Sequence, residues 1–370
     1  MEVQRVAIIG AGNGGCAAAA DLTLRGFEVS IYSPFPHALE SIQRCGGLVL
    51  EGVAGEGFVQ IEQVTQDISQ AVSDAQIVMV VVPTSALGFY AEKLAPVLRE
   101  DQILFLNPGH TCGGLFFLNS LRLAGYRGKI RCGESSTLTY SARLQGPGRV
   151  MIYRVVPKLP FAALPGRQLD EIASAVSQIY PCISPRQSVL ETAFSNMNAV
   201  EHPAQTVCNA GWIEHTKGDY YFYYEGTTPS VARVMEKVDQ ERMAVARALG
   251  IPVLSFAQDM YETGYTSKEA YESGSIYQVM QESEPNRWVK GPKSLDHRYL
   301  NEDVGYGLVP MAAFGDMMGV ETPVMDSLII LASVLNDRAY GTEGLTLEKM
   351  GLTPHMTRQE LESFLWEGYA

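Results

Sequence analysis

The sequence predicts an N-terminal α/β domain with a doubly wound, mostly parallel sheet, followed by a mostly α-helical C-terminal domain. Short β-branched runs alternate with helical patterns in the first half, and they stop near Pro185. Apolar residues spaced three and four apart dominate the remainder. A chain of 370 residues, 46% of them apolar, can form two or three domains with separate cores. We therefore expect domains at residues 1–185 and 186–370.

The strands of the first half are expected where apolar, β-branched residues cluster. Runs that are buried on both faces and separated by helices are typical of a parallel sheet. The expected strands are Arg5–Ile9, Glu28–Tyr32, Ile77–Val82, Gln102–Leu106, Lys129–Cys132 and Val150–Val156. Helices expected at Cys16–Arg25 and Ala86–Leu98 separate strands of this sheet.

One helix of the second half has clear signals at both ends. Thr228 can cap it and Pro229 suits its first turn. Gly250 follows the last residue of the apolar pattern and is expected to end the helix. Further helices are expected at Val189–Asn198, Pro203–His215, Lys268–Glu282, Pro310–Met318, Pro323–Asn336 and Thr357–Glu367.

Charge and cysteine content argue against several classes of protein. Lys and Arg number 28 against 41 Asp and Glu, and the resulting charge of −13 disfavours nucleic acid and anionic membranes as partners. The six cysteines form no Cys-x-x-Cys pair and no metal-ligand spacing with histidine, so we expect reduced thiols, no metal and a cytoplasmic location. The N-terminus lacks the pattern of a signal peptide, and the longest apolar run, Ile77–Pro83, is too short to cross a bilayer.

A glycine-rich segment directly follows the first expected strand. Gly10, Gly12 and Gly15 form the pattern G-x-G-x-x-G, and Asn13 and Gly14 lie within it, at the start of an alanine-rich helix. In this context the glycines allow a tight turn, close approach of a pyrophosphate and close packing of helix and strand. The helix N-terminus adds unpaired N–H groups for phosphate. We expect a Rossmann-type dinucleotide-binding domain; the alternative is a glycine-rich turn without a ligand.

The end of the second expected strand bears on the choice between NAD and NADP. Ser33 stands there, and the acidic residue that usually binds the ribose hydroxyls of NAD is missing. Ser33 can bind a 2′-phosphate, although the nearest arginine is Arg44. NADP is therefore modestly favoured, and NAD stays compatible. Pro83 and Thr84 end a later strand at the edge where such sheets bind ligands, and they contact the cofactor or form an ordinary turn.

Two polar segments of the second half contain the candidate catalytic residues. The first is Asn198–Gly211, which includes His202-Pro203, and the second is Asp296–Pro310, which includes Asp303. The pKa of histidine suits proton transfer near neutral pH, and a carboxylate on its other ring nitrogen fixes the tautomer. A histidine beside a proline is more often structural, so the residues alone leave both interpretations of His202 open.

Together with the glycine pattern, these segments resemble the octopine/nopaline (opine) dehydrogenase family. Its helical domain has the motifs Asn-x-x-x-His-Pro and Arg-Tyr-Leu-x-Glu-Asp-Val-x-Tyr-Gly-Leu-Val, which match Asn198–Pro203 and Arg298–Val309. The resemblance covers nearly the whole chain, as far as Leu345–Leu352. It implies that His202 and Asp303 form a catalytic dyad.

The resemblance also implies an activity, that of an NAD(P)-dependent oxidoreductase acting on CH–NH groups. Such an enzyme condenses a 2-oxo acid with the amine of an amino acid and reduces the product to a secondary-amine dicarboxylate. Arg298 is the candidate to bind a carboxylate, because a guanidinium binds it bidentately; an ion pair with Glu302 or Asp303 is an equally weighted alternative. Asn198 is a candidate to polarise a substrate oxygen. Gly305 stands where a proline is expected, which removes no catalytic group.

Other features have weaker links to the substrate. Thr139 and Tyr140 follow an expected strand and are candidates for substrate contacts. The aromatic cluster Tyr220–Tyr224 lines an amino-acid pocket or, more often for such clusters, an interface or a core edge. The expected partners are the two small-molecule substrates. A homodimer is kept as one possible assembly, and the sequence does not fix the number of subunits.

Two other functions fit parts of the sequence. Ketopantoate reductases and glycerol-3-phosphate dehydrogenases resemble this chain in having a dinucleotide domain and a helical domain. They use a lysine on the first helices of the second domain, and no lysine occurs between Ser188 and Thr216. A non-catalytic dinucleotide-sensing protein would keep the glycine segment and lose the proton relay, whereas His202 and Asp303 are both present.

Overall fold

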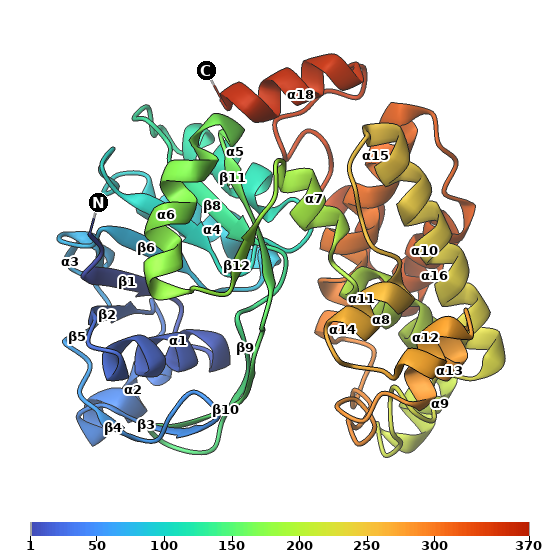
Figure 1. The fold of residues 1–370 in the computed structure, drawn as a ribbon, viewed down its shortest axis with the longest axis horizontal. Coiled ribbons are helices and arrows are strands. Elements are labelled where there is room, and N and C mark those ends of the chain that lie inside the picture. Colours follow the sequence, from blue (N-terminus) through green and yellow to red (C-terminus); the bar gives the residue numbers. More distant parts are fainter. Residues whose placement is uncertain (1, 370) are drawn as a thin grey trace. The chain divides into compact units, whose positions relative to one another are not determined.

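The computed structural model describes residues 2–369, which form two compact units (Figure 1). The first unit contains the residues up to Ala193 together with those from Glu362 onward, and the second is Phe194–Leu361. The C-terminal segment joins the first unit because the Tyr369 hydroxyl donates to the carbonyl of Leu115 at 2.8 Å. The second domain therefore ends before the C-terminal segment, which differs from the expected range of 186–370.

The first unit contains an eight-stranded sheet in the order β12-β11-β8-β7-β6-β1-β2-β5. Its strands are β1 (Arg5–Ile9), β2 (Glu28–Tyr32), β5 (Gln63–Thr65), β6 (Ile77–Val80), β7 (Ile103–Leu106), β8 (Cys132–Ser135), β11 (Leu159–Leu164) and β12 (Ile183–Pro185). All neighbouring strands pair in parallel except β8 and β11. The chain runs outward from β1 to β5 and returns to β6 on the other side of β1, so the strand order reverses between β1 and β6.

A second sheet contains four strands in the order β4-β3-β10-β9. They are β3 (Leu48–Gly52), β4 (Gly57–Val59), β9 (Tyr140–Leu144) and β10 (Arg149–Val155). Of these, only β10 corresponds to an expected strand. The others were missed because they are short and contain glycine, glutamate, serine or arginine, which weakens the apolar pattern.

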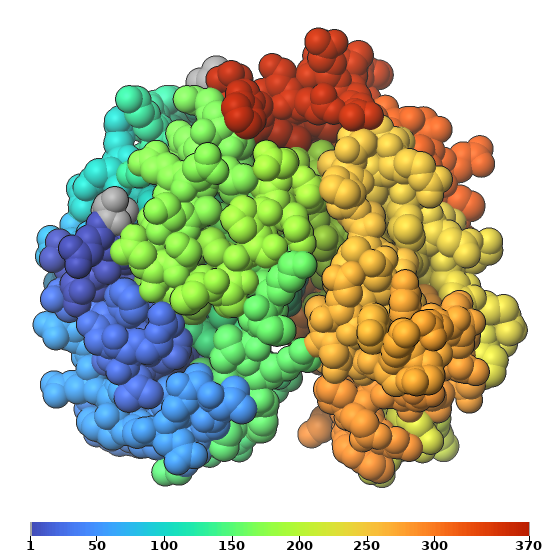
Figure 2. Space-filling view, in the orientation of Figure 1, coloured from blue at the N-terminus to red at the C-terminus, as the bar shows by residue number. Residues whose placement is uncertain are grey.

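Helices and 3₁₀ turns connect the strands of the first unit. They are α1 (Asn13–Leu24), α2 (Pro36–Cys45), α3 (Ile68–Val72), η1 (Thr84–Ala86), α4 (Leu87–Leu94), α5 (Gly113–Leu123), η2 (Gly166–Gln168), α6 (Leu169–Ile179) and α7 (Val189–Phe194). In Figure 1 α6 crosses the front of the sheet, and in the space-filling view its light-green region closes that face of the unit (Figure 2). The run Ala17–Ala20 in α1 is fully buried, because small side chains allow the helix to pack closely.

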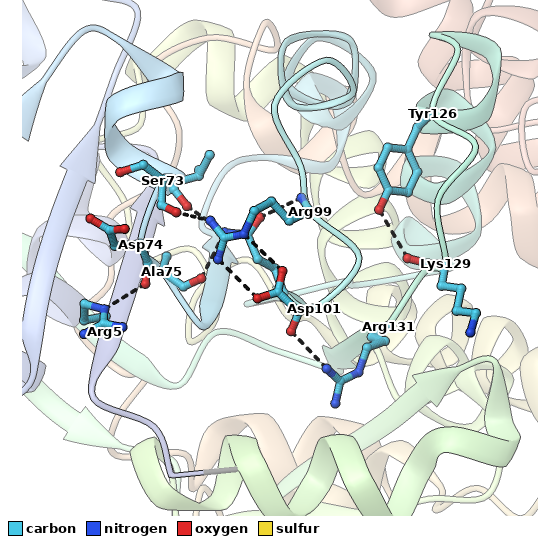
Figure 3. A network of polar contacts seen from close by, with 11 residues as sticks. Arg5, Ser73, Asp74, Ala75, Arg99, Asp101, Tyr126, Lys129 and Arg131 are labelled. Atoms are coloured by element: carbon cyan, nitrogen blue, oxygen red, sulfur yellow. Dashed lines mark hydrogen bonds and ion pairs between the residues drawn. The ribbon is translucent and has the colours of Figure 1, made fainter.

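A polar network joins the loops at the amino ends of the central strands (Figure 3). Arg99 binds the carbonyl of Ser73 and its Nε donates to Asp101 Oδ1 at 3.0 Å. Arg131 Nη1 donates to the carbonyl of Asp101 at 2.9 Å. Because these loops precede β6, β7 and β8, the network fixes the sheet at the edge opposite its carboxyl ends. The strand expected at Lys129–Cys132 begins only at Cys132, because the preceding residues belong to these loops.

The second unit is helical, and the predicted fold class is thereby confirmed. Its elements are α8 (Asn198–Cys208), α9 (Ala210–Thr216), α10 (Pro229–Leu249), α11 (Phe256–Glu262), α12 (Lys268–Glu272), α13 (Ile276–Gln281), α14 (Arg298–Asn301), the π-helical η3 (Val304–Leu308), α15 (Val309–Met318), α16 (Pro323–Asn336) and α17 (Tyr340–Glu343). A further helix, α18 (Arg358–Glu367), begins in this unit and ends in the first. Within residues 2–369, no helix has the length and apolar content needed to span a membrane.

The central helix α10 has the end signals expected from the sequence. Thr228 Oγ1 accepts a hydrogen bond from the N–H of Val231 at 3.4 Å. Gly250 closes the helix with φ of +72°, in the left-handed region that favours glycine. The helix expected at 268–282 is instead divided into α12 and α13, because Gly274 adopts φ of +70° between them.

Candidate active site

The glycine segment forms the turn from β1 to α1 at the carboxyl edge of the large sheet. Gly10 has φ of +117°, and a Cβ at this position would overlap the carbonyl oxygen of Val81. A Cβ on Gly15 would overlap the carbonyl oxygen of Gly10, so α1 packs against this turn only with glycine there. Gly12, the N-cap of α1, has open space where a Cβ would point. The open space at the N-cap, next to two glycines that have no room for a side chain, fits a pyrophosphate bound at the helix N-terminus.

Two further residues of this turn have defined neighbours. Asn13 Oδ1 accepts a hydrogen bond from the N–H of Leu144 at 2.9 Å, so this side chain links the turn to β9. A Cβ on Gly14 would press against the side chain of Leu138. Both residues therefore shape the turn, and their backbone N–H groups belong to the first turn of α1.

The remaining candidates for cofactor contacts follow β2 and β6. Ser33 follows β2 and is 2% exposed, and its Oγ accepts from the N–H of Phe35 at 3.2 Å. The hydroxyl proton of Ser33 is not used in that bond. Pro83 is exposed and Thr84 is buried at the start of η1, next to the point where the strand order reverses. Such a point is where open α/β sheets bind ligands.

The second unit brings His202 and Asp303 into direct contact. Nδ1 of His202 lies 2.7 Å from Oδ2 of Asp303, and the side chains are only 4% and 1% exposed. A carboxylate at Nδ1 makes that nitrogen the hydrogen-bond donor and leaves Nε2 to exchange protons. Such a contact between an aspartate and a buried histidine can orient the imidazole for acid–base chemistry.

Local structure explains how these two residues meet. The helix α8 was expected to begin at Pro203, but it begins at Asn198 and contains His202 and Pro203 in its interior. Asp303 directly precedes η3, and π-helical turns are frequent at functional sites. Gly307 in η3 lets the two segments pack closely, since its Cβ would lie 3.0 Å from the Cβ of Ala199 in α8.

Two tyrosines complete the surroundings of His202. The Tyr223 hydroxyl lies 2.8 Å from Nε2 of His202, and the Tyr299 ring stacks on the imidazole with centroids 3.9 Å apart. Burial raises the pKa of Tyr223 well above its usual range, so its phenol is neutral. From the sequence, neither tyrosine was predicted to contact His202. The sequence nevertheless contained an indication for each. Tyr223 belongs to the aromatic cluster 220–224, and Tyr299 belongs to the same polar segment as Asp303.

A second carboxyl lies at the other ring nitrogen, and it was also missed. Oε1 of Glu201 is 3.5 Å from Nε2 of His202, and Glu201 is 7% exposed. Burial raises the pKa of Glu201 to about 7; the charge of His202 lowers it, while Asp303 and Asp259 raise it. Its position immediately before the His-Pro pair is the signal that the sequence offered.

Arg298 and Asn198, the candidates for substrate binding, lie in α14 and α8. Arg298 is 49% exposed at its side chain, and its Nε lies 3.7 Å from Glu302 Oε2. The ion pair considered for Arg298 is thus formed, but it is long and engages few of the five guanidinium donors. Asn198 is half-buried at the first turn of α8, where its N–H donates to Asn196 Oδ1 at 3.2 Å. Because α14 packs on α8, both residues lie on elements next to the dyad.

The structure places Thr139 and Tyr140 differently from the other candidates. Both are buried in the first unit, with exposed fractions of 0% and 3%. The Tyr140 hydroxyl donates to Asp21 Oδ2 at 2.6 Å, and Thr139 Oγ1 donates to Asn107 Oδ1 at 3.1 Å. These side chains bind within the first unit, so the structure gives no support for the substrate contacts expected of them.

Known proteins resemble this chain over nearly its whole length. Residues 185–336 match the family of the NAD/NADP octopine/nopaline dehydrogenase α-helical domain, and residues 5–107 match the NAD-dependent glycerol-3-phosphate dehydrogenase N-terminus. The chain is 35% identical to an opine dehydrogenase of Arthrobacter sp. (strain 1C), covering 95% of this chain and 96% of that protein. It is 28% identical to the protein ocs of Agrobacterium vitis, over 94% and 96% of the two chains.

Solved structures share the same fold. Octopine dehydrogenase with NADH and L-arginine superposes with a TM-score of 0.73 at 18% identity, covering 96% of this chain and 100% of that one. Apo yersinopine dehydrogenase gives a TM-score of 0.76 at 15% identity, covering 99% and 97%. NADH is bound in structures of the former enzyme and NADP⁺ in a structure of the latter. This chain belongs to the octopine/nopaline (opine) dehydrogenase family and is an NAD(P)-dependent oxidoreductase acting on CH–NH groups.

Proposed function

We propose that His202 and Asp303 form the catalytic dyad of this opine dehydrogenase and that Nε2 of His202 moves the protons of the condensation. The observation that supports this most strongly is the buried 2.7 Å contact between Nδ1 and Asp303. The carboxylate keeps the imidazole in one tautomer and stabilises the imidazolium that forms when Nε2 takes a proton. The substrates are a 2-oxo acid and the amine of an amino acid.

The proposed reaction needs proton transfers at a defined place. The ammonium of the amino acid must lose a proton to Nε2 before its nitrogen can bond to the carbonyl carbon. The imidazolium then gives that proton to the carbonyl oxygen. A second transfer from nitrogen to oxygen releases water and leaves a C=N bond. A bound nicotinamide would supply the hydride that reduces this bond. The reduced nitrogen finally takes up one proton, so each turnover consumes one.

The hydrogen bonds of His202 suit a general base. With Nδ1 held by Asp303, Nε2 is the nitrogen left to accept the substrate proton, and the Tyr223 hydroxyl lies 2.8 Å from it. In this proposal Arg298 binds a substrate carboxylate and Asn198 polarises the carbonyl or carbinolamine oxygen.

The cofactor is assigned to the carboxyl edge of the large sheet. The open N-cap of α1 receives the pyrophosphate, and the absence of an acidic residue at Ser33 favours NADP. The residues proposed to contact the cofactor are Gly10, Gly12, Asn13, Gly14, Gly15, Ser33, Pro83 and Thr84.

We also propose that the enzyme works in the cytoplasm as a homodimer. All six cysteines are free thiols, as is typical of proteins in a reducing compartment. The helix α16 exposes Ile330, Leu331 and Val334 on one face, and contiguous exposed apolar residues are typical of protein interfaces. Sedimentation equilibrium would test the assembly, and a monomer at micromolar concentration would contradict it.

A substrate screen tests the proposed function. Oxidation of NADPH and NADH is followed with 2-oxo acids paired with amino acids, and each component is omitted in turn. Pyruvate with L-arginine is a suitable first pair, because structures of octopine dehydrogenase contain them. We expect turnover only when cofactor, oxo acid and amino acid are all present. Reduction of the oxo acid alone at the same rate would instead support a hydroxy-acid dehydrogenase.

A further inference from the structure

We propose that Glu201 is a second proton-carrying group of this site, which in its acid form returns a proton to Nε2 of His202 in each turnover. The inference rests on the proposed role of His202. It assigns Glu201 as a positioning and proton-supplying residue that acts through the histidine.

The geometry places one carboxyl at each nitrogen of the imidazole. Asp303 is 2.7 Å from Nδ1, a direct hydrogen bond, whereas Oε1 of Glu201 is 3.5 Å from Nε2. The longer distance leaves Nε2 available to the Tyr223 hydroxyl or to a substrate, yet a small movement brings Glu201 within hydrogen-bonding distance. The side chains of Glu201 and His202 are 10% and 4% exposed, so water competes little for this contact.

The hydrogen bonding around Glu201 favours its acid form. Its second oxygen, Oε2, is buried and has no hydrogen-bond partner among residues 2–369. Gln205, one turn further along α8 and on the same face, has a buried Oε1 that also lacks a donor. Buried acceptors without donors are costly, and the acid form of Glu201 avoids a buried carboxylate oxygen that no donor satisfies.

The charged and titratable groups that face Glu201 come from several elements. Burial has the largest effect on its pKa, and Asp303, before η3, and Asp259, in α11, raise it further through like charge. The opposing influence is His202 in α8 itself. The phenols of Tyr223 and Tyr299 also face this carboxyl, and burial keeps both neutral.

The proton balance of the reaction gives this carboxyl a task. The earlier transfers leave the His202 imidazole neutral when the hydride has been transferred. The Glu201 O–H bond then breaks, its proton moves to Nε2, and Glu201 becomes a carboxylate. The imidazolium gives that proton to the new secondary amine, and the imidazole is neutral again. Solvent returns one proton to Glu201 before the next turnover, which matches the one proton consumed. In the oxidative direction the same carboxylate accepts the proton.

The test compares Glu201→Gln with wild type over a range of pH. We use the substrate pair that gives the highest rate in the screen above. In wild type, kcat for condensation is expected to be highest when Glu201 is protonated and to fall as pH rises through about 7. Because the two groups interact, the observed value belongs to the Glu201–His202 pair. Glu201→Gln should lower kcat about 10-fold at pH 6, and its profile should lose this ionisation, with KM and NADPH affinity unchanged.

Two control variants identify the group that titrates. Glu134→Gln removes a buried carboxyl of the first unit whose pKa burial also raises to about 7, and the ionisation of kcat should persist. Asp259→Asn removes a like charge near Glu201 and should move the ionisation to lower pH. Loss of the ionisation in either control would assign it to that residue and overturn the proposal.

Further outcomes separate this proposal from the one it rests on. A wild-type profile in Glu201→Gln, with His202→Ala inactive, overturns only the role of Glu201. An active His202→Ala protein overturns the dyad itself. If Glu201→Gln does not fold, infrared spectroscopy of the Glu134→Gln and Asp259→Asn double variant still decides, because it removes the two other carboxyls whose pKa is raised to about 7 and about 6. A protonated carboxyl band that disappears near pH 7 supports the proposal, and its absence refutes it.

Discussion

The glycine turn of the first unit and the His202 cluster of the second unit are built in different ways. The His202 cluster consists of His202, Asp303, Glu201, Tyr223 and Tyr299. The turn works through backbone and through missing side chains: Gly10 and Gly15 have no room for a Cβ, and Gly12 leaves space open. The His202 cluster works through side chains that bind one another in a buried environment. A phosphate site needs N–H groups and space, whereas proton transfer needs an oriented histidine.

This difference decides how each site responds to mutation. Substitutions in the turn act through steric overlap, so they affect cofactor binding or packing and leave acid–base chemistry alone. Substitutions in the cluster remove a proton-transfer group or its partner, so they affect turnover while the dinucleotide turn, in the other unit, keeps its structure. Each variant below either sharpens this contrast or contradicts it.

The largest effect is expected for His202→Ala. If Nε2 moves the protons, kcat should fall roughly 10²- to 10⁴-fold, with NADPH affinity nearly unchanged. Steady-state kinetics and a fluorescence titration of NADPH measure the two quantities, and circular dichroism checks the fold. A folded variant with near-normal turnover would return His202 to a structural role.

Asp303→Asn should have the next largest effect, a loss of about 10²-fold or more in kcat. The amide cannot stabilise an imidazolium and allows the wrong tautomer. The double variant with His202→Ala should be little worse than His202→Ala alone, because Asp303 acts through the histidine. Additive losses would show that Asp303 acts independently. The melting temperature must be compared as well, since Asp303 is 1% exposed.

The turn should show a different pattern when two of its glycines are exchanged for alanine. Gly12→Ala has space for its Cβ, so we expect an unchanged melting temperature and NADPH binding weakened about 10-fold by the methyl group at the N-cap. Gly15→Ala overlaps the carbonyl of Gly10 and should destabilise the fold by about 1–3 kcal/mol. Thermal melts and NADPH titrations measure both effects. Equal loss of stability in the two variants would contradict the division of roles.

Tyr223→Phe should have a smaller effect, about 5-fold on kcat, because it removes one hydrogen bond worth about 1 kcal/mol while keeping the ring. The Tyr299 ring still stacks on the imidazole in this variant. The pH profile of kcat provides the readout. A loss comparable to that of His202→Ala would show that Tyr223 itself transfers the proton.

The same contrast explains what the sequence could predict. The glycine spacing is local, so Gly10–Gly15 and the flanking β1 and α1 could be identified from a short segment. His202 and Asp303 are far apart in the chain, and their pairing followed from the family resemblance and not from any local pattern. Tyr223 and Glu201 were missed because an aromatic cluster and a lone acid are usually surface or core features.

Other differences between the expectations and the structure have local causes. Pro203 was expected to start a helix, because proline more often occupies the first turn. In the structure His202 and Pro203 lie within α8. Thr139 and Tyr140 were selected for their position after a strand. Their hydroxyls donate to Asn107 and Asp21. These contacts depend on tertiary packing and could not be predicted from the sequence.

The smallest effect concerns the choice of nucleotide, at the edge of the dinucleotide site. Ser33 is the residue at the end of β2, and its Oγ accepts from the N–H of Phe35, which leaves the hydroxyl proton for a 2′-phosphate. NADPH should therefore bind at least as tightly as NADH. Ser33→Ala removes this donor and should weaken NADPH binding only about 3- to 5-fold, near 1 kcal/mol, with NADH unaffected.

Ser33→Asp should have the opposite selectivity, because its carboxylate repels the 2′-phosphate and can bind the ribose hydroxyls of NADH. Ser33 is 2% exposed, so the melting temperature of each variant is compared with that of wild type before affinities are interpreted. Wild-type binding in which NADH is favoured by tenfold or more, about 1.4 kcal/mol, would overturn the preference. It would also show that the glycine turn that binds phosphate can be recognised from the sequence, whereas the side chain that selects between NADH and NADPH cannot be recognised in this way.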